Sequence, residues 1–344
     1  MTDLGLDAIF VSNEINQHFL SGFDFTDGYL FITQTEAYLV TDFRYFEMAE
    51  NRAYPEFKVV MPEARREFLT KLIYENGVKI LGFEGSFLPY AEYRHYVEKY
   101  PDVEFVDIKT TIEDMRYIKT PEQIAKMQRA QDITDKAFSQ LLSVINTDMT
   151  EIEVAAELEY AMRRNGADSA AFQTIAVTAD ASALPHGTPR NVKLRRGFLT
   201  MDFGAKVEGY CSDMTRTIVV GKADEDIKHL YNTVLSAQLA ALDFLKAGVD
   251  AAEADKVARD IIDKDYPGTF GHSLGHGVGL LIHEKPGLSR YYAGYKLRVG
   301  EIVTVEPGIY LYGKYGCRIE DMVAIEDGGV YNFTHSTKEL IEIY

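Results

Sequence analysis

The stretch MDFGAKVEGYCSDMTRTI, residues 201–218, places two aspartates in segments that otherwise have the pattern of buried strands. Asp202 follows the apolar run FLTM, and Asp213 directly precedes MTRTIVV. On one continuous strand these two residues would lie about 36 Å apart. A hairpin that turns at Val207-Glu208 would instead place Asp202 directly opposite Asp213, roughly 5 Å away between Cβ atoms. Two buried carboxylates that close repel each other unless a proton or a cation lies between them.

A second predicted hairpin repeats this arrangement in EIVTVEPGIYLYGKYGCRIEDMVAI, residues 301–325. Glu306 ends the apolar run IVTV, and Glu320 lies just before the apolar stretch MVAI. A turn centred on Gly313, in a loop rich in glycine and tyrosine, places the two glutamates opposite each other. The sequence therefore predicts two hairpins that each carry a pair of facing carboxylates.

The segment between the two hairpins, GHSLGHGVGLLIHE, contains His272, His276 and His283. Its glycines argue against a stable helix and suggest a backbone held close to a ligand. Four carboxylates and one imidazole are a suitable set for two divalent cations about 3.5–4 Å apart. Such ligands suit Mn²⁺, Co²⁺, Fe²⁺ or Zn²⁺. A single aspartate in a strand usually marks an edge, and a single histidine is usually a satisfied polar group, but four carboxylates on two registered hairpins together with one histidine favour a metal site.

Composition and charge narrow the class of protein. A chain of 344 residues favours two domains, and 26% charged residues are typical of a globular protein. The formal net charge of −17 argues against binding to nucleic acid or to an anionic membrane surface. We find no signal peptide and no membrane span in the sequence. The two cysteines, Cys211 and Cys317, cannot build a disulfide framework, which suits a cytoplasmic protein with both residues buried as small hydrophobic groups.

The first part of the chain alternates apolar strands with helical patterns, which indicates an α/β layer. The predicted strands are LDAIFV, GYLFIT, EAYLVT, FKVVM, KILGFE and VEFVDI, and the predicted helices are 43–53, 64–76 and 88–99. Further along, capping boxes begin two helices, and the second of these is expected to end at Gly166. The boxes are Thr120 to Gln123 and Thr150 to Glu153. Two further helices are expected over 224–246 and 251–264. Strand-like segments are expected over 170–178, 198–219, 270–284 and 300–326. We therefore expect an α+β fold, with a small α/β domain over 1–118 and a larger α+β domain over 119–344.

The signatures MDFGA, GYCSDMTRT, HGVG, VEPGIY and RIED resemble those of the pita-bread metallopeptidases. This family includes methionine aminopeptidase, aminopeptidase P, prolidase and creatinase. The resemblance covers 119–344, and TDFRYFEMAENRA near the N-terminus is similar to the N-terminal domain of the Xaa-Pro enzymes and creatinase. It implies a creatinase-like N-terminal domain followed by a pita-bread catalytic domain. It also implies a homodimer or a larger homo-oligomer.

The resemblance implies a ligand set for two divalent metal ions per subunit. Asp202 would chelate one ion, and Asp213 and Glu320 would bridge both. His276 and Glu306 would complete the coordination of the other ion. Manganese is the first expectation, with Co²⁺, Zn²⁺ or Fe²⁺ as alternatives.

Residues outside the ligand set indicate the branch of the family. His186, in ALPHGTP, and His283 match the family's two active-site histidines that are not ligands. His272, Tyr310 and Arg318, which are expected to contribute to substrate binding, resemble aminopeptidase P and prolidase rather than methionine aminopeptidase. Arg318 lies two residues before Glu320 on a predicted strand, so it faces the same side and is expected to pair with the carboxylates. Creatinase is disfavoured because it works without metal and lacks the carboxylate ligands that this sequence contains.

We therefore expect a metallo-exopeptidase that cleaves the bond between an N-terminal residue and proline, in peptides or in dipeptides. Glu306 is expected to carry a proton from the attacking water to the leaving proline nitrogen. His186 and His283 would donate hydrogen bonds to the substrate and the developing oxyanion, and His272 would contact the proline side. The alternatives are a methionine aminopeptidase and a non-catalytic peptide-binding protein on the same fold. The sequence leaves open whether dipeptides or longer peptides are preferred.

Overall fold

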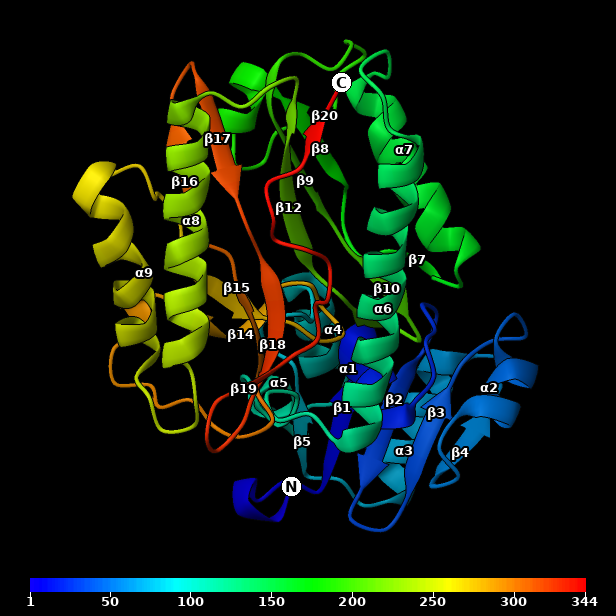
Figure 1. The fold of residues 1–344 in the computed structure, drawn as a ribbon. Coiled ribbons are helices and arrows are strands. Elements are labelled where there is room, and N and C mark those ends of the chain that lie inside the picture. Colours follow the sequence, from blue (N-terminus) through cyan, green and yellow to red (C-terminus); the bar gives the residue numbers. More distant parts are fainter. The chain divides into compact units, whose positions relative to one another are not determined.

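A computed structural model describes every residue, Met1–Tyr344, and the chain divides into two compact units, Met1–Arg116 and Tyr117–Tyr344. Figure 1 shows both units, coloured along the sequence. Each unit has its own sheets and its own hydrophobic core.

The N-terminal unit contains one six-stranded mixed sheet with the order β4-β3-β2-β1-β5-β6. Its strands are β1 (Ala8–Val11), β2 (Tyr29–Thr33), β3 (Ala37–Val40), β4 (Phe57–Val60), β5 (Ile80–Phe83) and β6 (Glu104–Asp107). Its helices are α1 (Glu14–Ser21), α2 (Phe46–Arg52), α3 (Arg65–Glu75), α4 (Tyr90–Lys99) and α5 (Thr111–Met115). All six predicted strands and all three predicted helices are confirmed. The sequence analysis missed the short α5 and also α1, although Asn13 caps the first turn of α1 by accepting hydrogen bonds from Ile15 N and Asn16 N.

This sheet is covered on both faces, as expected where helices alternate with strands. Consecutive residues of β2 illustrate the arrangement, because Leu30 and Phe31 are both fully buried but belong to different hydrophobic clusters. Side chains alternate across a strand, so the two clusters lie on opposite faces of the sheet. The apolar run of β2 is therefore a central strand with two buried faces, whereas β4 and β6 form the edges of the sheet and are only partly buried.

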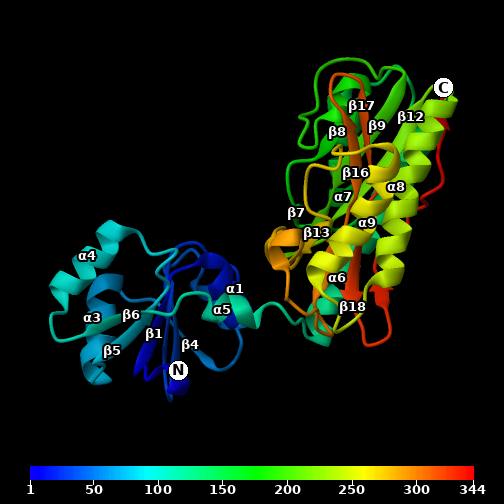
Figure 2. The same ribbon diagram turned by 90° about the vertical axis from the view of Figure 1, so that its left-hand side faces the viewer.

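The C-terminal unit is built from two pairs of helices and the strands between them (Figures 1 and 2). The first pair is α6 (Pro121–Val144) with α7 (Glu151–Arg164), and the second is α8 (Glu225–Phe244) with α9 (Ala251–Asp265). Both predicted capping boxes are present, with Thr120 and Thr150 accepting from the backbone N–H groups three residues on. The first pair packs on the first set of strands through one cluster, and the second pair packs on the later strands through another.

The strands of this unit form several small sheets, with the orders β11-β10-β7, β20-β12-β9-β8, β14-β13-β15-β18-β19 and β16-β17. The early strands are β7 (Ser169–Ala170), β8 (Ile175–Thr178), β9 (Gly197–Phe203), β10 (Ala205–Val207), β11 (Tyr210–Cys211) and β12 (Met214–Val220). The later strands are β13 (Gly275–Gly277), β14 (Glu284–Leu288), β15 (Ile302–Val305), β16 (Gly308–Leu311), β17 (Tyr315–Arg318), β18 (Asp321–Ile325), β19 (Val330–Asn332) and β20 (Glu342–Ile343). Both cysteines are buried and free, as expected.

The first hairpin is present, but its predicted register was wrong by two residues. Asp202 pairs with Thr215, not with Asp213. The turn lies at Glu208-Gly209, where φ is 49° and 82°. A two-residue hairpin turn of this type needs positive φ at both central positions, and the β-branched Val207 is poorly suited to that conformation. Because side chains alternate with a period of two, a two-residue shift leaves the two aspartates on the same side, diagonal to each other.

The second hairpin has the predicted register. Thr304 pairs with Met322 and Gly308 pairs with Arg318, so the register is the same on both sides of Glu306 and Glu320, which lie where the ladder is interrupted between the two sheets. The turn is centred on Gly313, with φ of 71°. The segment with three histidines is not helical, as expected, but of the strand expected over 270–284 only β13 and the first residue of β14 are present.

Candidate metal centre

A cavity of about 540 Å³ lies in the C-terminal unit, where the two hairpins and the histidine segment meet. It is lined by every residue that the sequence analysis proposed for the site except Tyr310. The lining also includes Phe172 to Ile175, from the segment that leads into β8, and Tyr292. The structure thus brings together side chains that are more than a hundred residues apart in the sequence.

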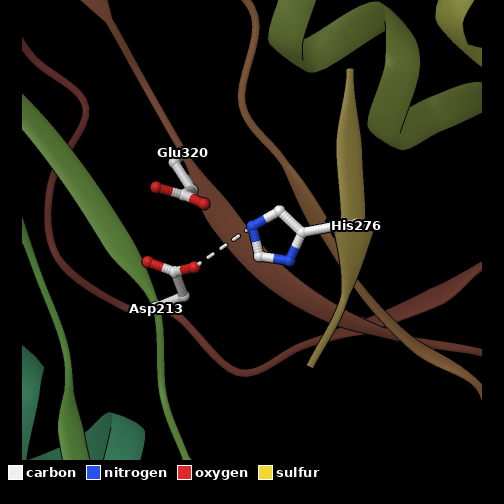
Figure 3. Close-up of side chains that lie close together, drawn as sticks. All are labelled: Asp213, His276 and Glu320. Atoms are coloured by element: carbon white, nitrogen blue, oxygen red, sulfur yellow. Dashed lines mark ion pairs between the residues drawn. The ribbon is translucent and has the colours of Figure 1, made fainter. Parts of the chain in front are cut away.

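Asp213, His276 and Glu320 form the tightest group in this cavity. One ligand atom from each lies within 4.8 Å of the others, and His276 Nε2 is 3.5 Å from Asp213 Oδ2. Figure 3 shows the three side chains pointing toward one another. Asp213 directly precedes β12, His276 lies on β13, and Glu320 directly precedes β18. Each side chain is therefore fixed at or beside a strand.

Glu306 and Asp202 lie beside this group. Glu306 Oε1 is 3.3 Å from His276 Nε2. Asp202 directs Oδ2 to the guanidinium of Arg318, 2.6 Å from Nη2. The other oxygen, Asp202 Oδ1, is buried and has no hydrogen-bond partner. A buried carboxylate oxygen without a partner is costly, and a cation bound at this position would satisfy it.

The two hairpins are joined beside the cluster by Thr215 and Glu320. The backbone N–H of Glu320 donates to the carbonyl of Thr215 at 3.1 Å, and Thr215 Oγ1 donates to Glu320 Oε2 at 2.7 Å. The sequence analysis did not identify this threonine. Its spacing offered a signal, because residues two apart on a strand share a face, and Thr215 follows Asp213 by two.

Three carboxyl groups of this cluster, those of Asp213, Glu306 and Glu320, have raised pKa values. Burial, followed by the nearby Glu320 and Asp202, raises the pKa of Asp213 well above its usual value. Burial and the carboxylates of Glu306 and Asp202 likewise raise the pKa of Glu320. Burial raises the pKa of Glu306 to about 7, although Arg318 opposes the shift. Bound divalent cations would offset the repulsion among these buried carboxylates, so the donor set fits the metal ions that the resemblance implies.

The hydrogen bonds of His276 leave Nε2 directed at the carboxylates. Nδ1 lies 3.1 Å from the carbonyl of Gly277, and a carbonyl only accepts, so Nδ1 carries the hydrogen. The lone pair of the neutral ring is then on Nε2, as a metal ligand requires. Thr304 supports the same region, because its hydroxyl accepts from His276 N at 3.1 Å and donates to Glu306 Oε1 at 3.0 Å.

A second chain of hydrogen bonds connects Arg318 to His272. Arg318 Nη1 donates to Tyr310 Oη at 2.7 Å, and Tyr310 Oη lies 2.9 Å from His272 Nε2. His272 Nδ1 lies 2.9 Å from the carbonyl of Ser273 and donates to it. Since arginine only donates and a carbonyl only accepts, Tyr310 donates its hydroxyl hydrogen to His272. Burial and Arg318 lower the pKa of His272 to about 3, so its ring is neutral.

His186 and His283 reach the cavity from exposed positions. The ring of His283 lies edge-on to that of His276, with 4.3 Å between the centroids. His186 belongs to the loop between β8 and β9. Neither residue belongs to the tight group of Asp213, His276 and Glu320, so both remain accessible to a molecule in the cavity.

The fold and the site define the class of protein, a metallopeptidase with an added N-terminal domain. Residues 125–327 match metallopeptidase family M24, and residues 1–118 match the creatinase/prolidase N-terminal domain. The chain belongs to metallopeptidase family M24 and is a peptidase enzyme that depends on divalent metal. The predicted fold, a creatinase-like domain followed by a pita-bread catalytic domain, is confirmed. None of its helices has the length and apolar character required to cross a membrane.

Individual relatives resemble the chain along nearly its whole length. A Xaa-Pro dipeptidase of Pyrococcus furiosus is 39% identical, with 99% of this chain and 97% of the relative covered. A solved structure of a Xaa-Pro dipeptidase from Bacillus anthracis has a TM-score of 0.94 at 41% identity, covering 99% of this chain and 96% of the other. The X-Pro aminopeptidase from Thermotoga maritima has a TM-score of 0.94 at 35% identity, covering 98% of both chains.

Proposed function

We propose that this protein hydrolyses the peptide bond between an N-terminal residue and proline. The observation that carries the proposal is the buried cluster of four carboxylates and His276 in a cavity that also presents His186 and His283. Relatives named for action on Xaa-Pro substrates support the choice of bond. Proline lacks a peptide N–H and has a fixed φ, so an enzyme that does not rely on that N–H is suited to it.

We propose that two divalent metal ions bind to this cluster, with Asp202 on one ion and Asp213 and Glu320 shared between both. His276 and Glu306 would hold the other ion. When bound, such ions polarise the substrate carbonyl and lower the pKa of water. The buried, unpartnered Asp202 Oδ1 supports the ligand set. Mn²⁺ is our first choice for the metal, ahead of Co²⁺, Zn²⁺ and Fe²⁺, because oxygen ligands dominate.

The remaining residues bind substrate and move protons in this proposal. Glu306 would transfer a proton to the leaving proline nitrogen, and Thr304 orients its Oε1 for that purpose. His186 and His283 would donate hydrogen bonds to the substrate carbonyl and to the charge that develops on it. His272 would face the proline side of the cavity. Both of its ring nitrogens already have partners in the protein, so it would act there through the face and edge of its ring.

Arg318 and Tyr310 would hold the carboxylates of Asp202 and Glu306 in position. Arg318 contacts Asp202 directly and lies 4.0 Å from Glu306 Oε2, and Tyr310 fixes its guanidinium. We further propose a catalytic domain over 119–344, an N-terminal domain over 1–118, and a cytoplasmic homodimer or larger homo-oligomer. The proposed partners are small peptides with proline at the second position.

The test compares peptides that differ only at the second residue. The metal-loaded enzyme should cleave Ala-Pro-Ala and Ala-Pro much faster than Ala-Ala-Ala and Ala-Ala. Equal rates with and without proline would place the protein outside the Xaa-Pro branch, and preferred removal of methionine from Met-Ala-Ala would assign it to the methionine aminopeptidase branch. Binding of all four peptides without hydrolysis would support a peptide-binding role. The ratio between Ala-Pro-Ala and Ala-Pro separates an aminopeptidase from a dipeptidase.

A further inference from the structure

The loop that carries His272 has no regular structure of its own. Between the end of α9 at Asp265 and the start of β13 at Gly275 the chain contains neither helix nor strand. Backbone hydrogen bonds of a helix or sheet therefore cannot fix its geometry, although it forms part of the cavity wall and leads directly into His276. Two charged side chains on the neighbouring helix α9, Asp255 and Arg259, provide that support.

Asp255 is 2% exposed and holds the end of the loop. Its two oxygens accept from Arg259 Nε and Nη2, each at 3.0 Å. The oxygen Oδ1 also accepts from the backbone N–H of Leu274 at 2.9 Å. A buried carboxylate with an ion-pair partner and a backbone donor is fully occupied, so Asp255 connects α9 rigidly to the residue that precedes β13.

Arg259 holds the beginning of the same loop. Nη1 donates to the carbonyl of Phe270 at 2.6 Å, and Nη2 donates to the carbonyl of His272 at 2.9 Å. The guanidinium also lies over the Phe270 ring, 4.3 Å from its centroid. Only the planar fork of arginine can serve one carboxylate, two carbonyls and an aromatic face together.

From the Asp255–Arg259 pair, two short paths of hydrogen bonds lead to the carboxylate cluster. Leu274, held by Asp255, accepts from the backbone N–H of Glu306 at 2.8 Å. On the other path, the loop carries His272, whose ring accepts from Tyr310 and so connects to Arg318. A displacement of the loop by a fraction of an ångström would therefore move groups on both sides of the cluster.

We propose that Asp255 and Arg259 are positioning residues for the metal centre, acting through the backbone of the loop. Neither residue lines the cavity, so neither touches a substrate there. The inference rests on the proposed function only for the activity measurement, because metal affinity reports on the same geometry without any substrate. Partners that orient the ligands of a metal site affect its affinity and its activity alike.

The same helix contains a matched control. Lys256 and Asp260 form an ion pair with the same four-residue spacing as Asp255 and Arg259. Both of their side chains are 60% exposed. An exposed pair of this kind contributes little to stability or to a distant site. If the Asp255–Arg259 pair did no more than support α9, its removal would lower stability but leave the Mn²⁺ Kd and kcat at the values of Lys256→Ala.

The experiment measures Mn²⁺ affinity of the metal-stripped full-length chain by calorimetry, and kcat and KM of the Mn²⁺-loaded enzyme on Ala-Pro-Ala. For Arg259→Ala we expect kcat to fall by ~10–100-fold and the Mn²⁺ Kd to rise by a similar factor. KM should change by less than about threefold, because no substrate contact is removed. Lys256→Ala should equal the wild type in all three quantities.

Two conservative variants separate positioning from general stability. Arg259→Lys keeps the charge but not the fork, so it should resemble Arg259→Ala. Asp255→Asn keeps an oxygen for Leu274 N–H, so its Mn²⁺ Kd should lie between those of the wild type and Arg259→Ala. Should Arg259→Ala fail to fold, Asp255→Asn alone must still show the raised Kd.

Wild-type Kd and kcat in Arg259→Ala, or full recovery in Arg259→Lys, would overturn the proposal. A wild-type chain that binds Mn²⁺ but cleaves no proline peptide would refute the proposed function. In that case, the Mn²⁺ Kd values of the wild type and the variants would still decide whether Asp255 and Arg259 position the metal centre.

Discussion

Glu320 and Asp321 are consecutive residues, and both are buried carboxylates, with 1% and 0% exposure. Their surroundings are opposite. Asp321 contacts Arg216 at 2.8 Å and Lys338 at 2.6 Å, and it also accepts from Gln238 and Asn332. Burial raises its pKa, but these cations more than offset that effect, and the pKa lies below the usual value.

Glu320 points to the other side of the strand, toward Asp213, Glu306 and Asp202, with Arg318 as the cation of that group. Its pKa is raised. The comparison shows that burial alone does not identify a metal site. A buried carboxylate whose charge is balanced by protein cations stabilises the fold, and a cluster with more buried carboxylates than cations is completed by metal.

The largest effect should follow from replacing Glu320. Glu320→Gln keeps the shape of the side chain but removes a shared metal ligand, so we expect loss of bound Mn²⁺ and activity at background level. The metal-free variant should be at least as stable as the metal-free wild type, because one of four repelling carboxylates is gone. Elemental analysis and denaturant unfolding check both points. Retention of two metal ions would remove Glu320 from the ligand set.

Asp321→Asn should act mainly on stability. The change leaves the buried Arg216 and the partly buried Lys338 without a balancing charge, and breaking a buried ion pair in this way costs about 3–5 kcal/mol. The metal content of the folded fraction should stay at the wild-type level. Denaturant unfolding measures the loss; a variant as stable as the wild type but depleted of metal would reverse the roles of the two neighbours.

The histidines give a further contrast of the same kind. His276→Ala removes the imidazole beside Asp213 and Glu306, so it should lose at least one metal ion and nearly all activity. His283→Ala should keep both ions and lose kcat by roughly 10²–10³, the scale for one oxyanion donor. Metal analysis of the two variants distinguishes the ligand from the oxyanion donor. If His283→Ala loses metal and His276→Ala keeps both ions, the roles assigned to the two histidines are reversed.

The smallest predicted effect concerns pH. Glu306, whose folded pKa is raised from 4.5 to about 7, holds more protons in the folded chain than in the unfolded chain over that interval. Its contribution to stability is therefore lost as pH rises from 4.5 through about 7, and Asp213 and Glu320, whose pKa values are also raised, act with the same sign. His276, with a lowered pKa, acts with the opposite sign only below about 6.5.

Between about pH 6.5 and 7, the free energy of unfolding of the metal-free protein should thus fall, with a slope of up to about 1.4 kcal/mol per pH unit for each carboxyl that titrates. Urea unfolding at several pH values measures the slope. Glu320→Gln should flatten it, and Mn²⁺ should abolish it. A metal-free protein that becomes more stable over this interval would contradict the raised pKa values of the three carboxyl groups.

Much of the site could be predicted from the sequence because strand periodicity is strict. The error in the first hairpin moved the pairing of Asp202 from Thr215 to Asp213 but kept both aspartates on one side. Even this register was accessible, because Glu208-Gly209 accommodates positive φ better than Val207-Glu208. The second register was correct because Gly313 fixed the centre of the turn.

Other features could not be predicted, because they depend on contacts between distant segments. Nothing in the sequence near Asp255 indicates that it holds Leu274. Likewise, the partners of Asp321 come from β12, α8 and the C-terminal segment, so the opposite roles of two adjacent acids become visible only in the folded chain. The periodicity of a strand predicts the side to which each residue points, but the residues that it contacts there depend on how distant segments pack.

The most direct test of the central claim is the melting temperature with and without Mn²⁺, measured for the wild type, Glu320→Gln and Asp321→Asn. At a hundredfold excess over Kd, bound metal should add about 2.7 kcal/mol to the stability of the folded chain. We predict that Mn²⁺ raises the melting temperature of the wild type and of Asp321→Asn by similar amounts and leaves that of Glu320→Gln nearly unchanged. Equal stabilisation of all three proteins, or of none, would contradict the assignment of the carboxylate cluster as the metal centre.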